Sequence, residues 1–162
     1  MKIFSCLVFV LLFVVAVSTP STQAQGVRSG PDPSTLRDPD LERDSLHNLE
    51  VAKNYFKLKK AYVAALKRCE EIIAGNPNFA KIEEVLWMAG VSSLSLAEGK
   101  GKQSRDLYVT FDGGEKRTLT ADQFREMGRD YLKKLISDFP NGSYTKQAEE
   151  ELRQLEAAPP KQ

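Results

Sequence analysis

Histidine, cysteine and tryptophan are scarce in this sequence, which has one histidine, two cysteines and one tryptophan among 162 residues. The histidine, His47, has no histidine or cysteine companion, so it is a poor metal ligand and is expected to face solvent. It also lacks the partner that a general base requires. Residues 99–102 alternate glycine and lysine without the spacing of a phosphate-binding loop. We therefore predict no catalytic residue, no metal and no cofactor.

The two cysteines are too few for a disulfide framework. Cys6 lies in an apolar N-terminal stretch that we expect to be removed, which leaves Cys69 as the one thiol of the mature chain. A lone cysteine in an oxidising compartment is either buried or paired with another chain. Cys69 lies on an apolar stripe with helical spacing, which favours burial over use as a nucleophile.

An excess of positive charge is also absent, because 23 Lys and Arg residues face 22 Asp and Glu residues, a net charge of +1. Nucleic-acid binding requires a surplus of basic side chains against phosphate, so we predict no nucleic-acid partner. The same balance argues against a strongly polybasic contact with a membrane.

One long apolar run stands at the N-terminus, at residues 3–17, after Met1 and Lys2. It is shorter than the roughly 20 residues that span a bilayer. Small residues at Thr22 and Ala24 then occupy the two positions that signal peptidase reads. We therefore predict a signal peptide cleaved after Ala24, a periplasmic or secreted mature protein, and no membrane span. No apolar segment precedes Cys6, so we expect no lipid anchor.

The rest of the chain divides by composition. After the signal peptide at residues 1–24, residues 25–40 are rich in Gly, Pro, Ser and Asp and are predicted to be a flexible linker, and residues 157–162 to be a disordered tail. Residues 41–156 form the predicted domain, with an insertion at about 99–119. Apolar residues recur there with helical spacing in five segments, at about 40–58, 61–74, 81–97, 120–139 and 143–155.

Local signals refine these helices. Thr120 and Gln123 have the spacing of a capping box at the start of the fourth helix. Residues 75–77 end the second helix, since Gly75 and Asn76 tolerate a left-handed cap and proline cannot continue a helix. Gly90 weakens the third helix by about 1 kcal/mol relative to alanine, which is best explained by the close approach of a neighbouring helix.

The insertion reads as a β-hairpin, because Asp112 and Gly113 separate two extended runs. Leu107, Val109 and Phe111 would share one face and Tyr108 and Thr110 the other. An isolated hairpin is marginal in water, so it either packs on its own helices or is completed by a strand from a partner. Both arrangements remain open at this point.

The helices form two pairs, each closing at a proline, followed by one more helix, which predicts an all-α, short helix-pair solenoid. Residues at repeat positions resemble the tetratricopeptide repeat: Leu49, Ala52, Phe56, Tyr62, Ala65 and Ile72 before Pro77, and Leu86, Ala89, Gly90, Leu132 and Leu135 before Pro140. Residues 62–73 and 131–152 are further similar to the outer-membrane assembly lipoproteins (BamD/YfiO-like), and less closely to periplasmic cell-division coordinators. The resemblance covers about residues 48–155.

This resemblance implies a concave groove lined by the first helix of each pair. The groove-facing positions would be His47, Glu50, Asn54 and Lys57 on the first helix, and Glu84, Trp87, Val91 and Leu94 on the third. Tryptophan is favoured at binding hot spots, although Trp87 could instead pack against the fifth helix or the insertion. The predicted partner-binding residues are therefore Glu50, Asn54, Lys57, Glu84, Trp87, Val91, Tyr108 and Phe111.

We predict an exported helical-repeat scaffold, not an enzyme, that binds another protein or peptide in the cell envelope. The resemblance implies an accessory of a complex like that for outer-membrane assembly. The alternative is a structural envelope protein that self-associates through the open ends of its solenoid and has no separate ligand.

Overall fold

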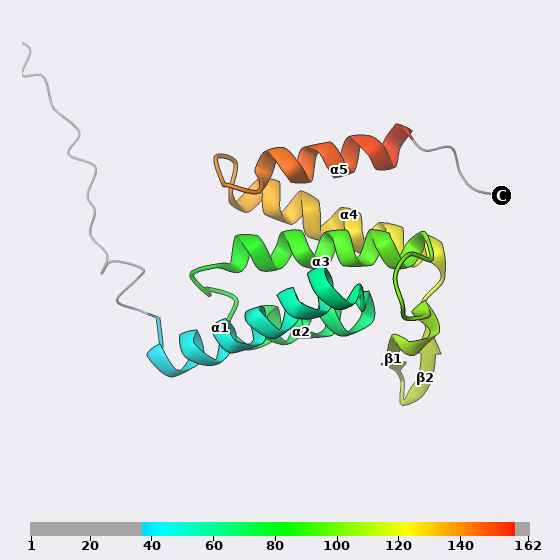
Figure 1. Cartoon of the computed structure of the whole chain (residues 1–162), viewed down its shortest axis with the longest axis horizontal. Coiled ribbons are helices and arrows are strands. Elements are labelled where there is room, and N and C mark those ends of the chain that lie inside the picture. The colour runs from blue at the N-terminus through cyan, green and yellow to red at the C-terminus, as the bar shows by residue number, and fades with distance from the viewer. Residues whose placement is uncertain (1–36, 158–162) are drawn as a thin grey trace, which may run out of the picture. The chain divides into compact units, whose positions relative to one another are not determined.

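The computed structural model describes residues 37–157, and in that part of the chain it contains five α-helices and one two-stranded hairpin. The helices are α1 (Pro39–Lys53), α2 (Tyr62–Gly75), α3 (Ile82–Ala97), α4 (Ala121–Asp138) and α5 (Thr145–Ala157). They lie in rows from α1 and α2 at one edge to α5 at the other (Figure 1). The predicted all-α fold with a hairpin insertion is confirmed. The predicted signal peptide, residues 1–24, lies outside the described residues.

The first helix begins with a side-chain cap. A carboxylate oxygen of Asp38 accepts hydrogen bonds from the backbone N–H groups of Asp40 at 2.8 Å and Leu41 at 3.4 Å. Pro39 occupies the first helical position, where its missing N–H costs nothing. Residues 38–40, which composition places at the end of the linker, therefore form the cap and first turn of α1.

The joint between the first two helices is a turn of π-helix, η2 (Asn54–Lys59), that continues α1 directly. Lys60 then adopts a left-handed conformation with φ of 52°, and the Ala61 N–H donates to the Tyr55 carbonyl at 3.0 Å. This reversal lies at the polar joint that separates the first two predicted helices. It turns the chain back so that α2 packs along α1.

The predicted left-handed cap at the end of α2 is wrong. Asn76 has φ of −143°, and Gly75 is not among the described glycines with positive φ. The Asn76 side-chain amide instead donates to Glu42 at 3.1 Å and to Ser45 at 3.2 Å, both on α1. Pro77 ends the helix as predicted, and the hydrogen bonds from Asn76 to α1 hold this end in a way that sequence-local rules do not capture.

Helices α3 and α4 approach each other closely at two glycines. A Cβ atom added to Gly90 would lie 2.7 Å from Cδ2 of Leu132, and one added to Gly128 would lie 3.0 Å from the Gly90 carbonyl oxygen. The close approach predicted at Gly90 is thus confirmed, and Gly128 is its counterpart on α4. The predicted capping box at Thr120 and Gln123, which begins α4, is also present.

Helix α3 is at the centre of the core, because α2 covers one side of it and α4 the other. Cys69 of α2 is fully buried in the same core, as its apolar stripe predicts, and burial raises the pKa of its thiol well above the usual value. The other large side chains that are almost completely buried are Phe124, Leu49, Leu66, Ile72, Leu86, Met88, Leu96, Leu132, Leu135 and Val85.

The insertion contains a short 3-10 turn, η3 (Arg105–Leu107), and the antiparallel strands β1 (Val109–Asp112) and β2 (Glu115–Thr118). Tyr108 fixes it to the helices: only 5% of this residue is exposed, and its ring packs edge-on against Phe124 with centroids 5.3 Å apart. Of the two arrangements that the sequence allowed, the structure therefore has the hairpin segment packed on its own chain.

The side chain of Glu70, on α2, accepts a hydrogen bond from the hydroxyl group of Tyr108. Tyr108 Oη donates to Glu70 Oε1 at 2.6 Å, and Tyr131 Oη lies 3.4 Å from the same oxygen. Burial raises the pKa of the Glu70 carboxyl, and the opposing effects of Tyr108, Lys67 and Tyr131 do not offset it. A half-buried carboxylate therefore joins α2, α4 and the insertion.

Replacing Glu70 with glutamine is expected to flatten the dependence of stability on pH. A carboxyl whose folded pKa is raised stabilises the protein fully below its unfolded pKa of about 4.3, and this stabilisation is lost as pH rises through the raised folded value. Glu70→Gln should therefore raise the free energy of unfolding near neutral pH and change it little at pH of about 4. Urea unfolding at several pH values in this range measures how steeply the free energy of unfolding depends on pH in the variant and in the unmodified protein. Glu149→Gln on the exposed surface of α5 is the control. Equal slopes for Glu70→Gln and the unmodified protein would contradict the assignment.

Candidate partner-binding groove

An ion pair links the two helices that the repeat pattern places along the groove. Lys53 Nζ of α1 lies 3.1 Å from Glu84 Oε2 of α3 and 3.2 Å from Glu50 Oε1. Burial lowers the pKa of Lys53, but the hydrogen bonds and charges of Glu84 and Glu50 outweigh burial and raise it. Lys53 was not among the predicted site residues, because nothing local marks it as the partner of a side chain on another helix.

Trp87 is the centre of a row of aromatic rings. Its ring lies 5.6 Å from that of Phe56 in η2 and 5.3 Å from that of Tyr144, which directly precedes α5. The residue is half-buried, and its indole nitrogen Nε1 is buried with no hydrogen-bond partner among the described residues. The tryptophan therefore forms part of a wall that runs from the first helix to the fifth.

Tyr144 extends this wall and is held from α3. Its backbone N–H donates to Glu83 Oε1 at 2.5 Å. Burial, together with the charge and hydrogen bonding of Glu84, raises the pKa of the Tyr144 hydroxyl, which stays protonated. Two adjacent acidic residues on α3 thus make different contacts: Glu83 accepts a hydrogen bond from the turn before α5, and Glu84 pairs with Lys53.

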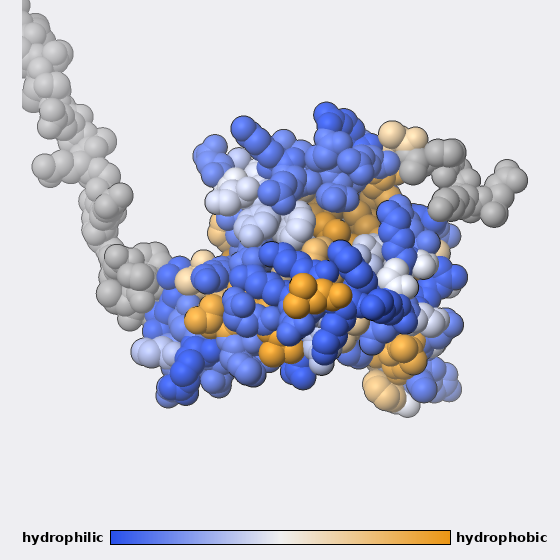
Figure 2. All heavy atoms as spheres, viewed as in Figure 1, coloured by the Kyte–Doolittle hydropathy of each residue, from blue (hydrophilic) through white to orange (hydrophobic). Residues whose placement is uncertain are grey.

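The structure places the other predicted residues in two regions. Asn54 and Lys57 are exposed on η2, and Val91 is half-buried one turn beyond Trp87 on α3. Tyr108 and Phe111 lie apart from these in the insertion, with Tyr108 packed into the core and Phe111 75% exposed. On the face shown in Figure 2, apolar atoms gather between α5 and the row of α3.

Neighbouring helices therefore combine a carboxylate–ammonium pair, an aromatic wall and exposed polar side chains. Such a surface can hold an extended or helical segment of another protein through ring contacts and hydrogen bonds. Within residues 37–157, no cluster of three or more His, Cys, Asp or Glu side chains could hold a metal ion.

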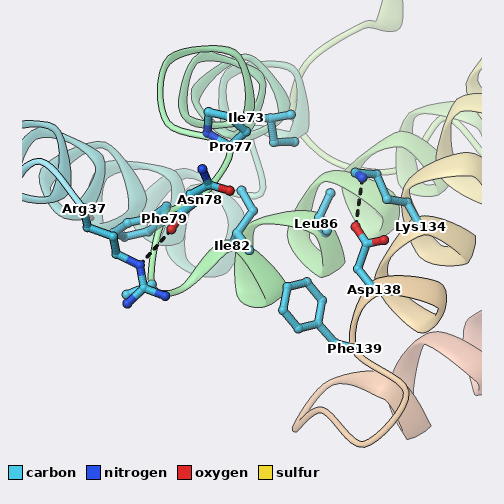
Figure 3. A pocket seen from close by; sticks show the side chains of 11 residues that line it. Arg37, Ile73, Pro77, Asn78, Phe79, Ile82, Leu86, Lys134, Asp138 and Phe139 are labelled. Atoms are coloured by element: carbon cyan, nitrogen blue, oxygen red, sulfur yellow. Dashed lines mark hydrogen bonds and ion pairs between the residues drawn. The ribbon is translucent and has the colours of Figure 1, made fainter. Parts of the chain in front are cut away.

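A separate cavity of about 450 Å³ lies between the turn after α2 and the C-terminal end of α4 (Figure 3). Ile82 and Leu86 of α3 are among its apolar lining residues. Several of its polar groups are already engaged, since Lys134 pairs with Asp138 at 2.8 Å and Arg37 Nε donates to the Asn78 carbonyl at 2.9 Å. None of the predicted site residues lines it. Sequence reasoning could not find this cavity, because it is formed by helix ends that are distant in sequence.

A family model described as YfiO, outer membrane lipoprotein, matches residues 47–158. The match covers more than half of the chain, from within α1 to the end of α5. No curated protein and no solved structure matches the chain.

The family match overturns the expectation that the protein has no lipid anchor. The proteins of this family are outer membrane lipoproteins, which are held at a membrane by covalently attached acyl chains. Cys69 is unsuitable for such an attachment because it is fully buried in α2, and Cys6 lies outside the described residues. No helix within residues 37–157 is both long and apolar enough to cross a bilayer.

Proposed function

The chain belongs to the YfiO family of outer membrane lipoproteins, and on this premise we propose that it is a non-catalytic scaffold whose α1–α3 groove binds a protein partner. The partner is a protein or peptide of the cell envelope, and the complex it serves is of the outer-membrane-assembly type. The observation that carries this proposal is the Lys53–Glu84 ion pair beside the part of the aromatic wall that Trp87 and Tyr144 form. These side chains come from two helices and the turn before a third, so the wall requires the folded repeat.

The chemistry of the wall supports recognition of a polypeptide. Tryptophan and tyrosine supply large contact areas at low cost in conformational entropy, which is why they dominate binding hot spots. The indole N–H of Trp87 has no acceptor among the described residues, so a small movement of the ring would allow it to donate to a partner's carbonyl oxygen. Asn54 and Lys57 add exposed polar groups along the same helical face.

Site-specific photo-crosslinking in the native host tests this proposal. A photoreactive amino acid at position 54 or 57 is expected to form a discrete adduct with an envelope protein. The matched control carries the same amino acid at position 133, which is exposed on α4. Equal adducts from position 133, or none from 54 and 57, would overturn the groove assignment. Adducts with a second copy of the chain alone would favour the self-associating structural protein.

A further inference from the structure

The hairpin segment presents apolar side chains to solvent. Successive side chains of a strand point to opposite faces, so Val109 and Phe111 face away from the side on which Tyr108 enters the core. Phe111 is 75% exposed, and Leu107, which lies shortly before strand β1, is 59% exposed. An antiparallel sheet with one covered face normally turns its apolar side to the core. Apolar atoms are visible over the hairpin in Figure 2, and exposed apolar patches mark interaction surfaces.

A second exposed apolar side chain lies at the same end of the molecule. Leu58, near the end of η2, is 76% exposed and stands between lysines at positions 57, 59 and 60. The loop before the hairpin contacts this element, since the Lys102 N–H donates to the Lys60 carbonyl at 2.9 Å. A Cβ atom on Gly101 would lie 2.5 Å from that same carbonyl oxygen, so the two backbones are in close contact.

Positive charge is concentrated in these two segments. Residues 57–60 and 98–118 together carry eight basic and four acidic side chains, a net charge of +4 against +1 for the whole chain. Lys60, Lys102 and Lys116 form no ion pair with the described acidic side chains. One end of the molecule is therefore basic although the whole chain is nearly neutral. The overall charge balance, taken alone, argued against a basic membrane contact.

We propose that this lysine-rich end, made of Leu58, Leu107 and Phe111 with Lys60, Lys102 and Lys116, docks on the anionic phospholipid surface of the membrane that anchors the protein. Isolated apolar side chains surrounded by lysines suit the interface, where the apolar groups enter the headgroup region. The lysine stems extend along the surface and their ammonium groups meet lipid phosphates. A protein partner would be expected to bury the free strand edges as well. The proposal depends on membership of a lipoprotein family and not on the groove.

The test attaches an environment-sensitive fluorophore to Thr118→Cys, an exposed position opposite Val109, and leaves Phe111 intact. The lipoprotein is purified from host membranes and reconstituted in vesicles of phosphatidylcholine, with or without about one third phosphatidylglycerol. The acyl chains of some vesicles carry nitroxide quenchers. Cys69 is fully buried and escapes labelling in the folded protein, and the parent protein without Thr118→Cys gives the background. A label at Glu149→Cys on α5 is the positional control.

We expect the emission of the fluorophore at position 118 to shift to shorter wavelength and to be quenched by the nitroxides in the anionic vesicles. The fluorophore at position 149 should show neither effect. The Lys60, Lys102 and Lys116→Gln triple variant should lower the docking equilibrium roughly a hundredfold, or about fivefold for each lysine. Phe111→Ser should lower it roughly tenfold. All four side chains lie at the surface, so the variants are expected to fold, which circular dichroism checks.

Three results would overturn the proposal. The first is no quenching at position 118 in anionic vesicles. The second is quenching that is unchanged in the triple lysine variant. The third is a photoreactive amino acid at position 118 that crosslinks to a protein in native membranes while the fluorophore at the same position stays unquenched in vesicles, which would assign this end to a protein partner. Because crosslinking at positions 54 and 57 is measured separately, failure here leaves the groove proposal untouched.

Discussion

Gly128→Val is expected to lower the free energy of unfolding by about 3 kcal/mol or more. A Cβ atom at this position would lie 2.7 Å from Leu94 Cδ2 and 3.0 Å from the Gly90 carbonyl oxygen. The leucine end could move, but the backbone oxygen belongs to α3, the most buried of the described helices, and the two further methyl groups of valine need additional space. The α3–α4 crossing would have to separate, and with it the packing of Leu132 against Gly90. Urea unfolding followed by circular dichroism measures the loss.

Gly75→Ala is the control for this prediction. Gly75 is the last residue of α2, its φ is not positive, and a Cβ atom there meets nothing within 4 Å. Alanine should leave stability unchanged or raise it by up to about 1 kcal/mol, because it loses less backbone entropy in a helix. If Gly128→Val and Gly75→Ala had similar small effects, the two helices would not be in the close contact described.

Tyr108→Ala is expected to cost about 3 to 4 kcal/mol of stability and to release the hairpin. The substitution removes a ring packed against Phe124 and leaves the Glu70 carboxylate with only the weaker contact to Tyr131. It also removes the cation–π contact of Lys67, whose Nζ lies 5.0 Å from the Tyr108 ring centroid. Hydrogen exchange of the amides of residues 109–118 should accelerate far more than that of α2 or α4.

Tyr108→Phe separates the hydroxyl group from the ring. It should cost about 1.5 to 3 kcal/mol, the range for a hydrogen bond to a charged group, and keep the hairpin amides protected. The same substitution in a Glu70→Gln background should cost less, because the acceptor is then neutral. A Tyr108→Ala protein that retained slow exchange throughout residues 109–118 would show that the hairpin is held by other contacts.

Helix positions could be predicted from the sequence because each helix buries a continuous stripe whose members are three or four residues apart. Leu49 and Ala52 illustrate this, since both are completely buried. Gly90 could be interpreted because a glycine inside a strongly apolar helix has few explanations. Its partner on α4 could not be identified, because pairing between helices depends on their relative rotation and not on local spacing.

The side chains that join distant elements escaped prediction for the same reason. Lys53 and Glu84 are one basic and one acidic residue among many, and only the fold brings them together. The outward apolar face of the hairpin is a second case, because alternation predicts two faces without saying which is covered. The hydrogen bond of Tyr108 to Glu70, a residue 38 positions away, fixes which face of the hairpin lies against the helices. The proposed partner-binding role of residues 50, 54, 57, 84, 87 and 91 stays a prediction until crosslinking tests it.

The position of Trp87 has a practical consequence for spectroscopy. The chain has one tryptophan, and it stands in the aromatic wall of the proposed groove, between the rings of Phe56 and Tyr144. Light that excites indole but not phenol therefore produces emission from this one side chain of the aromatic wall alone. The wavelength of that emission reports how much water contacts the indole ring. The unlabelled protein therefore carries its own optical probe of whether a partner covers the proposed groove, so a binding titration requires no added dye.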